Sequence, residues 1–188
     1  EVSKAFYDQV GLGTTAQFFY PAGLAIDASG NVYIADVANG AIRKLDPANN
    51  VTTVTNGFNR PWAVAVDSSS GRIFVADTGN NCIKVIETNS VTLIAGSGSP
   101  LLYGAVDRFI GTSALFNHPR GLFWVGGNTG LLVSDTDNGL LRRVYYNANV
   151  GVYSTASFAA NTTGVSLLKP IGIAQDNNGN FPVVDQGR

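Results

Sequence analysis

The sequence predicts an all-β protein made of repeated, four-stranded antiparallel sheets, and three observations carry this prediction. One phrase occurs four times: a proline, an apolar run, a turn, a second apolar run, and an aspartate that opens another turn. Short apolar runs alternate with clusters of turn residues, and no segment keeps a helical period. The four copies occupy residues 21–36, 61–77, 119–135 and 170–185. Such self-similarity marks one supersecondary unit used repeatedly, because a single unit cannot bury its own faces.

Each full unit predicts four strands joined by short turns. The expected strands are 62–67, 72–77, 82–87 and 91–95 in the second unit, and 24–27, 32–36, 41–45 and 51–55 in the first. Because these turns are so short, neighbouring strands must pair antiparallel.

The turn between the first two strands contains Ser-Gly or Asn-Gly at positions 29–30, 70–71 and 178–179. Glycine allows the positive φ that a tight hairpin needs. An aspartate precedes each of these turns, and we expect its carboxylate to cap the hairpin. The alternative is that these aspartates line a channel and hold a metal. They are Asp27, Asp67 and Asp176.

A second aspartate opens the turn after the second strand, as Asp36, Asp77 and Asp135. Calcium takes about six to eight oxygen ligands, and one carboxylate per sheet supplies too few. We therefore expect these carboxylates to accept hydrogen bonds from amides of their own turns. A basic residue stands seven positions after each aspartate, and we expect it to form surface or intersheet ion pairs. These residues are Arg43, Lys84 and Arg142.

The first strand of each unit is rich in glycine and alanine. Small residues are typical of places where several backbones crowd one axis, so the units are expected to fan out radially with the first strand innermost. The residues concerned are Gly23, Ala25, Ala63, Ala65, Gly121, Gly172 and Ala174.

Three motifs together resemble the NHL-repeat family: Pro-x-Gly-Leu-Ala-Ile-Asp at 21–27, Gly-Asn-Val-Tyr-Ile-Ala-Asp at 30–36, and Asp-Thr-Gly-Asn-Asn-x-Ile-Lys at 77–84. The resemblance covers nearly the whole chain. It implies a β-propeller, usually six-bladed, that acts mostly as a binding platform. The third copy departs from the pattern, with Val125 in place of the first aspartate and a longer hairpin at 126–130. The fourth places Pro182 inside its second strand, which predicts an irregular blade.

On this basis residues 1–188 form a partial propeller of about three and a half blades, expected to be part of a six-bladed ring. The blades lie near 21–55, 61–95 and 119–154, with an incomplete blade at 170–188 and insertions at 96–117 and 147–168. Residues 13–18 parallel 111–116, so the N-terminal segment resembles the end of another insertion. The alternative is a four-bladed ring whose last blade borrows strands from the N-terminus.

Composition limits the classes of partner. Hydrophobic residues make up 45% of the chain and charged residues 13%, which is typical of a folded domain. Twelve basic and 13 acidic residues give a net charge of −1, so no global field attracts nucleic acid or an anionic membrane. No apolar run approaches the roughly 20 residues of a membrane span, and we expect no membrane insertion of this segment. The one cysteine, Cys82, is expected to be an inert core residue.

Candidate ligand-binding residues gather on one face. In an up-and-down blade, the loop entering the first strand and the loop between the second and third strands emerge on the same side; we call this side the proline face. Aromatic and arginine side chains there are typical of binding hot spots. The alternative is that Trp62 packs between blades and the charges are solvated. The candidates are Tyr20, Arg60, Trp62, His118, Arg120, Lys169, Asn80 and Asn138.

The insertions carry aromatic residues, which we expect to anchor these loops between blades; ligand contact is the alternative. These residues are Tyr103, Phe109, Phe116, Tyr153 and Phe158.

No catalytic residue, metal site or cofactor is predicted. His118 is the only histidine, whereas zinc sites usually use several. Some propellers resembling the NHL family are amidating lyases that hold zinc through several histidines, a set this chain lacks. The glycine-rich segment 96–99 lacks the lysine of a phosphate loop.

The sequence therefore favours a non-catalytic scaffold that recognises a protein or peptide through the proline face. The alternative is a fragment of a metal-dependent lyase or hydrolase whose site is completed by further blades. Nucleic acid stays open as a partner because Arg60, Arg120 and Lys169 share the face, although the balanced charge disfavours it. Scarce lysine and abundant Asn, Ser and Thr favour an extracellular or cell-surface setting.

Overall fold

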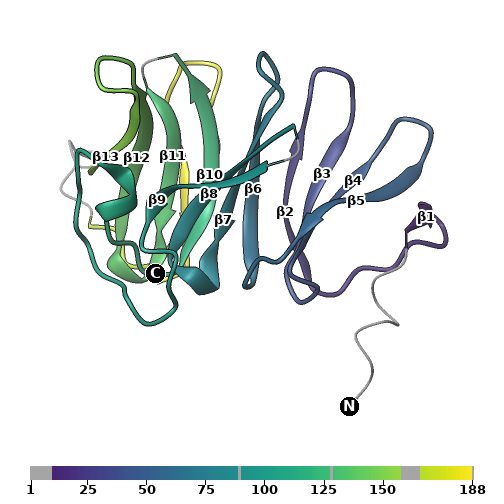
Figure 1. The fold of residues 1–188 in the computed structure, drawn as a ribbon, viewed down its shortest axis with the longest axis horizontal. Coiled ribbons are helices and arrows are strands. Elements are labelled where there is room, and N and C mark those ends of the chain that lie inside the picture. The colour runs from purple at the N-terminus through teal and green to yellow at the C-terminus, as the bar shows by residue number, and fades with distance from the viewer. Residues whose placement is uncertain (1–9, 89, 128, 158–165, 188) are drawn as a thin grey trace.

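Antiparallel sheets follow one another as blades along an open arc in the computed structural model, which describes residues 10–88, 90–127, 129–157 and 166–187 (Figure 1). Blade 1 contains β2 (Pro21–Ile26), β3 (Val32–Asp36), β4 (Ala41–Leu45) and β5 (Asn50–Asn56), with the short β1 (Gly11–Leu12) beyond β5. Blade 2 contains β6 (Pro61–Asp67), β7 (Arg72–Asp77), β8 (Cys82–Glu87) and β9 (Ser90–Gly96). Blade 3 contains β10 (Pro119–Gly126), β11 (Gly130–Asp135), β12 (Leu140–Asn147) and β13 (Val152–Ser157). Blade 4 contains β14 (Pro170–Ile173) and β15 (Val183–Asp185).

This arrangement confirms the predicted all-β propeller of four-stranded antiparallel blades. Helical structure among the described residues is limited to three single 3₁₀ turns: η2 (Thr78–Asn80), η3 (Gly111–Ser113) and η4 (Thr136–Asn138). None of the described residues lies in a helix that could cross a bilayer.

The same register recurs in every blade. The repeat proline pairs with the second aspartate, as in Pro61 with Asp77 and Pro119 with Asp135, and a β-bulge follows the proline. Proline has no N–H to donate, so it suits this first strand position. In blade 4, Pro182 lies just before β15, and the second strand keeps only three residues. The predicted irregularity of this blade is confirmed.

The first strands of successive blades lie side by side around the axis and form the hub. Gly23 shows how closely they approach: a Cβ there would lie 2.7 Å from Ala63 Cα in the next blade. A Cβ on Gly121 would lie 2.4 Å from the carbonyl oxygen of Ile171. The expectation that small residues mark the innermost strands is therefore confirmed.

Apolar side chains fill the spaces between blades. Between blades 2 and 3, the ring of Phe74 stacks on Trp124 with centroids 4.8 Å apart, and the fully buried Phe116 completes this core. Between blades 1 and 2, Ile42 and Val75 are both fully buried. Blade 2, which has a neighbour on each side, thus buries both of its faces.

The first insertion runs along the outer edge of blade 3. Arg108 and Thr155 of β13 exchange backbone and side-chain hydrogen bonds of 2.9 Å. The N-terminal β1 lies beside β5 in a comparable way, pairing Gly11 with Val51. β13 itself falls within the range expected for the second insertion.

The insertion aromatics divide into two groups. Phe116 and Tyr153 pack in the core between blades 2 and 3, as expected. Tyr103 and Phe109 instead remain 58% exposed, so the anchoring prediction is wrong for these two residues. Phe158 lies outside the described residues.

In blades 1, 2 and 4 the first aspartate caps its hairpin, as predicted. Asp27 accepts hydrogen bonds from the backbone N–H groups of Ser29 and Asn31, both at 2.9 Å. The Asn31 side chain makes the largest contribution to lowering the pKa of Asp27. Burial raises the pKa of Asp67, but hydrogen bonds from Ser69 and Ser70 outweigh it and lower that pKa overall.

These depressed pKa values predict acid sensitivity. A carboxylate whose pKa is lower in the folded state binds protons more weakly there than in the unfolded chain. Its stabilising effect is complete above the ordinary value of 3.8 and is lost as the pH falls through the folded value. We expect the urea concentration at the midpoint of unfolding to decrease as the pH is lowered below about 4, and to decrease less in the D67N variant. An unchanged midpoint between pH 5 and pH 3 would contradict this expectation.

Candidate functional site

A pair of hydrogen bonds shapes the proline face of each of the first three blades. The second aspartate reaches back to the backbone N–H two residues before the proline. The distances are 2.8 Å from Asp36 to Phe19, 2.7 Å from Asp77 to Asn59, and 2.8 Å from Asp135 to Asn117. The N–H two residues after each aspartate donates to the carbonyl oxygen of the same partner, at 2.8–3.1 Å. We call this pair of bonds the clamp.

The clamp corrects one expectation from the sequence. Asp77 and Asp135 accept no hydrogen bond from the backbone N–H groups of their own 3₁₀ turns, where only the side-chain amides of Asn80 and Asn138 donate to them. Their carboxylates hold the loop before the first strand instead. That loop carries candidate binding residues.

Directly after the clamped residue, the backbone adopts a left-handed conformation. The φ angles are 53° for Tyr20, 53° for Arg60 and 47° for His118. Each residue precedes a proline, which restricts the preceding residue to extended conformations, so this geometry is strained. Strain of this kind persists only where surrounding contacts impose it, and it collects at functional sites. All three side chains are exposed on the proline face, Tyr20 by 73%.

The basic residues seven positions after each second aspartate form ion pairs inside their own blade. Arg43 Nη1 lies 3.3 Å from Asp36, Lys84 Nζ lies 2.6 Å from Asp77, and Arg142 Nη1 lies 2.9 Å from Asp135. The side chains of Arg43 and Arg142 are fully buried. The expectation of surface or interblade pairs is therefore wrong. Burial raises the pKa of Asp135 despite its arginine partner, and burial raises the pKa of Cys82 to about 12.

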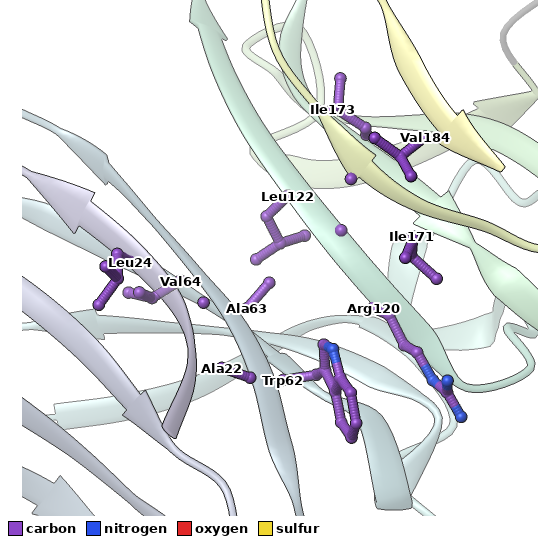
Figure 2. Close-up of a pocket in the computed structure, with 13 residues that line it drawn as sticks. Ala22, Leu24, Trp62, Ala63, Val64, Arg120, Leu122, Ile171, Ile173 and Val184 are labelled. Carbon is purple, nitrogen blue, oxygen red and sulfur yellow. The ribbon is translucent and has the colours of Figure 1, made fainter. Parts of the chain in front are cut away.

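Trp62 and Arg120 form the centre of the site. Each stands one residue after a repeat proline, on neighbouring first strands, and each is partly buried. The guanidinium carbon of Arg120 lies 4.7 Å from the centroid of the indole, in cation–π contact. Figure 2 shows both side chains pointing toward the same end of the hub pocket, away from Ile173 and Val184. Among the described residues, the buried Nε of Arg120 finds no hydrogen-bond acceptor.

Three hollows meet at Trp62. The hub pocket has a volume of about 460 Å³ and is lined mainly by apolar residues such as Leu24, Val64 and Leu122 (Figure 2). A second hollow of about 540 Å³ lies between Tyr20, Val37, Arg60 and Trp62. A small one of about 100 Å³ adjoins both, between Arg60, Trp62, His118 and Arg120. The structure thus brings together five of the eight candidate residues.

The other three candidates are engaged in the frame of the site. Asn80 donates to Asp77 at 2.9 Å, and Asn138 donates to Asp135 at 2.8 Å and to the carbonyl oxygen of Gly104. Both side-chain amides therefore support their turns. Lys169 Nζ lies 3.7 Å from Asp137.

Asp137 is the residue that sequence reasoning missed. Asp137 lies 2.9 Å from Nδ1 of His118, which directly precedes blade 3, and 3.7 Å from Nζ of Lys169, which directly precedes blade 4. It therefore joins the third and fourth blades at the edge of the site. A signal was present, because the third repeat has Asp137 where the second has Gly79. Within the described ranges, no three His, Cys, Asp or Glu side chains are placed to hold a metal ion.

Comparison with a family model supports the repeat reading of the sequence. The NHL repeat model matches residues 18–45 and 58–86, which cover the first three strands of blades 1 and 2.

Curated relatives agree with that match. NHL repeat-containing protein 2 of Homo sapiens is 32% identical over 109 residues, which cover 48% of this chain and 15% of that protein. Peptidylglycine alpha-amidating monooxygenase of Rattus norvegicus is 28% identical over 165 residues, which cover 80% of this chain and 16% of that protein. The chain therefore spans about a sixth of these relatives.

The solved structure of an auxiliary nutrient binding protein from Bacteroides ovatus superposes with a TM-score of 0.70 at 17% identity. The match covers 90% of this chain and 46% of that one. At this identity the likeness concerns the fold.

Proposed function

Because the chain belongs to the NHL-repeat family and folds as propeller blades, we propose that it is a non-catalytic scaffold that recognises a protein or peptide through the proline face. We further propose that its blades are part of a six-bladed ring. Propeller blades of this family give a rigid frame for loops, which suits a binding role.

The observation that carries the proposal is the position of Trp62. It is half-buried, it stacks with Arg120, and it lines all three hollows of the proline face. Tryptophan and arginine at the centre of such a surface are the residue types that dominate binding energies. The clamps fix the backbone beside the left-handed residues around it, so little backbone conformational entropy is lost on binding.

Selection from a library of random 12-residue peptides tests this function. We expect the chain to enrich specific peptides, and W62A to weaken their binding by about 2 kcal/mol, or roughly thirtyfold. Y146A is the matched control, because Tyr146 is an exposed aromatic residue on β12, the third strand of blade 3. Circular dichroism checks that both variants fold. If no peptide is enriched, or if W62A binds as tightly as the parent, the proposal fails.

A second candidate function rests on the similarity to the amidating monooxygenase, which extends over 80% of this chain. In that case a ring of further blades would complete a metal site for a lyase or hydrolase. The described residues do not fit such a site, since His118 has only Asp137 as a nearby potential ligand. Elemental analysis of the full-length protein separates the two functions: stoichiometric zinc or calcium would favour the enzyme, and its absence the scaffold.

A further inference from the structure

We propose that the ligand of the proline face carries a carboxylate, which the guanidinium groups of Arg60 and Arg120 bind beside the indole of Trp62. This inference rests on the proposed function and specifies it: the partner is an acidic peptide segment. Three features support it: the pairing of charges, the geometry of the arginines and the shape of the hollows.

The pairing of charges singles out two arginines. On the proline face, Asp137 is already shared by His118 and Lys169. Beneath that face, the cations of blades 1, 2 and 3 are paired with their own clamp aspartates. Within the described part of the chain, Arg60 and Arg120 have no carboxylate partner. On the proline face they are the positive charges left for a ligand.

The geometry of Arg120 suits a carboxylate. Its guanidinium carbon lies over the indole of Trp62, 4.7 Å from the ring centroid, and a guanidinium presents a planar fork of N–H donors that matches the two oxygens of a carboxylate. Its Nε is buried and still lacks an acceptor among the described residues. Because that atom is closed off from solvent, the donors within reach of a ligand are the two Nη groups, and a carboxylate on them forms charge-assisted hydrogen bonds. Arg60 lines the small hollow together with Arg120 and faces the same space.

The hollows on either side are apolar and add a second requirement. Tyr20, Val37 and Trp62 border one of them, and Leu24 and Leu122 border the other. A ligand that places its carboxylate between the arginines therefore has apolar space next to it. An acidic residue adjacent to leucine or a similar side chain fulfils both conditions.

A nucleic acid fits this surface less well. Affinity for nucleic acid depends on neutralising many phosphates, whereas the proline face offers two unpaired guanidinium groups with Asp137 beside them. The whole chain carries a net charge of −1. Single-stranded RNA is therefore the competing ligand in the test.

The test uses fluorescence anisotropy with labelled 12-residue peptides. One set has a central Leu-Asp or Leu-Glu pair and an amidated C-terminus, a second replaces Asp and Glu by Asn and Gln, and a third carries a free C-terminal carboxylate in place of the acidic side chain. Oligouridine of 12 nucleotides is the RNA probe. We expect at least one carboxylate-bearing set to bind at least tenfold more tightly than the neutral set. The set that binds more tightly identifies whether a side chain or the C-terminus supplies the carboxylate.

Variants connect this binding to the two arginines. R60Q and R120Q should each weaken the binding of acidic peptides at least tenfold and leave the binding of the neutral set unchanged. R120K should weaken them as well, because lysine keeps the charge but loses the planar fork of donors. R108Q is the matched control: it removes the same charge from an exposed arginine of the first insertion. Thermal melting of each variant checks the fold.

The outcomes distinguish this inference from the function on which it rests. If acidic and neutral peptides bind equally well, the proposed carboxylate recognition is wrong, but the proposed function as a peptide-binding scaffold still holds. Binding of no peptide, either here or in the library selection, overturns both. A third outcome is that oligouridine binds in a salt-dependent manner, that R60Q and R120Q abolish this binding, and that no peptide binds. In that case the ligand is RNA and not a peptide.

Discussion

Replacing Arg142 by alanine is expected to lower the free energy of unfolding by about 3–5 kcal/mol, because it breaks a buried charge network. The Arg142 side chain is fully buried and donates to Asp135 at 2.9 Å and to Asp107 at 2.7 Å. It also donates to the carbonyl oxygens of Val106 and Leu115, and it lies over the ring of Phe116. Its removal leaves Asp135 buried without its cation and removes the bonds from Arg142 to the first insertion, while the bonds between Arg108 and Thr155 remain.

The neighbouring residue supplies the control. Arg143 is partly exposed and stacks on Tyr145, so R143A should cost less than about 1 kcal/mol. Urea unfolding followed by tryptophan fluorescence measures both variants. A loss below about 1 kcal/mol for R142A would show that the network does not hold the insertion.

Replacing Gly121 by alanine is expected to destabilise the fold by about 1–3 kcal/mol, as overpacking does in tightly packed cores. The new Cβ would lie 2.4 Å from the carbonyl oxygen of Ile171 and 2.7 Å from Ser134 Oγ. Ile171 belongs to the first strand of blade 4, so relief of this clash must separate two blades at the hub.

Gly172 occupies the same repeat position one blade further on. A Cβ there meets only side-chain atoms of Val184, at 3.6 Å or more, which is ordinary contact. G172A should therefore change stability by less than about 0.5 kcal/mol, or increase it slightly, because glycine is unfavourable within a strand. Comparing the melting temperatures of the two variants tests the crowding. Equal effects would mean that the hub is not tightly packed at Gly121.

Local rules were enough to predict the blades from the sequence. Strand lengths, hairpin glycines and the capping role of Asp27 depend on residues close together in the chain. The clamp was missed because Asp36 meets Phe19 only after the strands between them have paired. No local rule indicates such a partner.

The ion pairs inside the blades could have been predicted. In β11 and β12, Asp135 pairs with Leu140, which places Arg142 two residues along the partner strand and on the same face of the sheet. Diagonal neighbours of this kind lie within reach of long side chains. The register of the hairpin, once counted, thus places the cation beside the carboxylate.

The candidate site was predicted in part. Blade topology alone placed Tyr20, Arg60, Trp62, His118 and Arg120 on one face, because equivalent loops of an up-and-down sheet emerge together. It could not show which polar side chains already have partners. Asn80 and Asn138 support their turns, and Asp137 lies beside His118 and Lys169, so only the three-dimensional structure shows that Arg60 and Arg120 are the arginines of this face without a carboxylate partner.

In the loops before the prolines, the groups that maintain the fold are different from the side chains that are exposed to a ligand. The hydrogen bonds of the clamps involve aspartates and main-chain atoms, while the residue before each proline takes no part in the clamp and exposes its side chain. Tyrosine, arginine and histidine occupy these three sites on nearly identical main-chain paths. Amino acids at these sites can therefore be exchanged between repeats to redesign selectivity while the architecture beneath them is preserved.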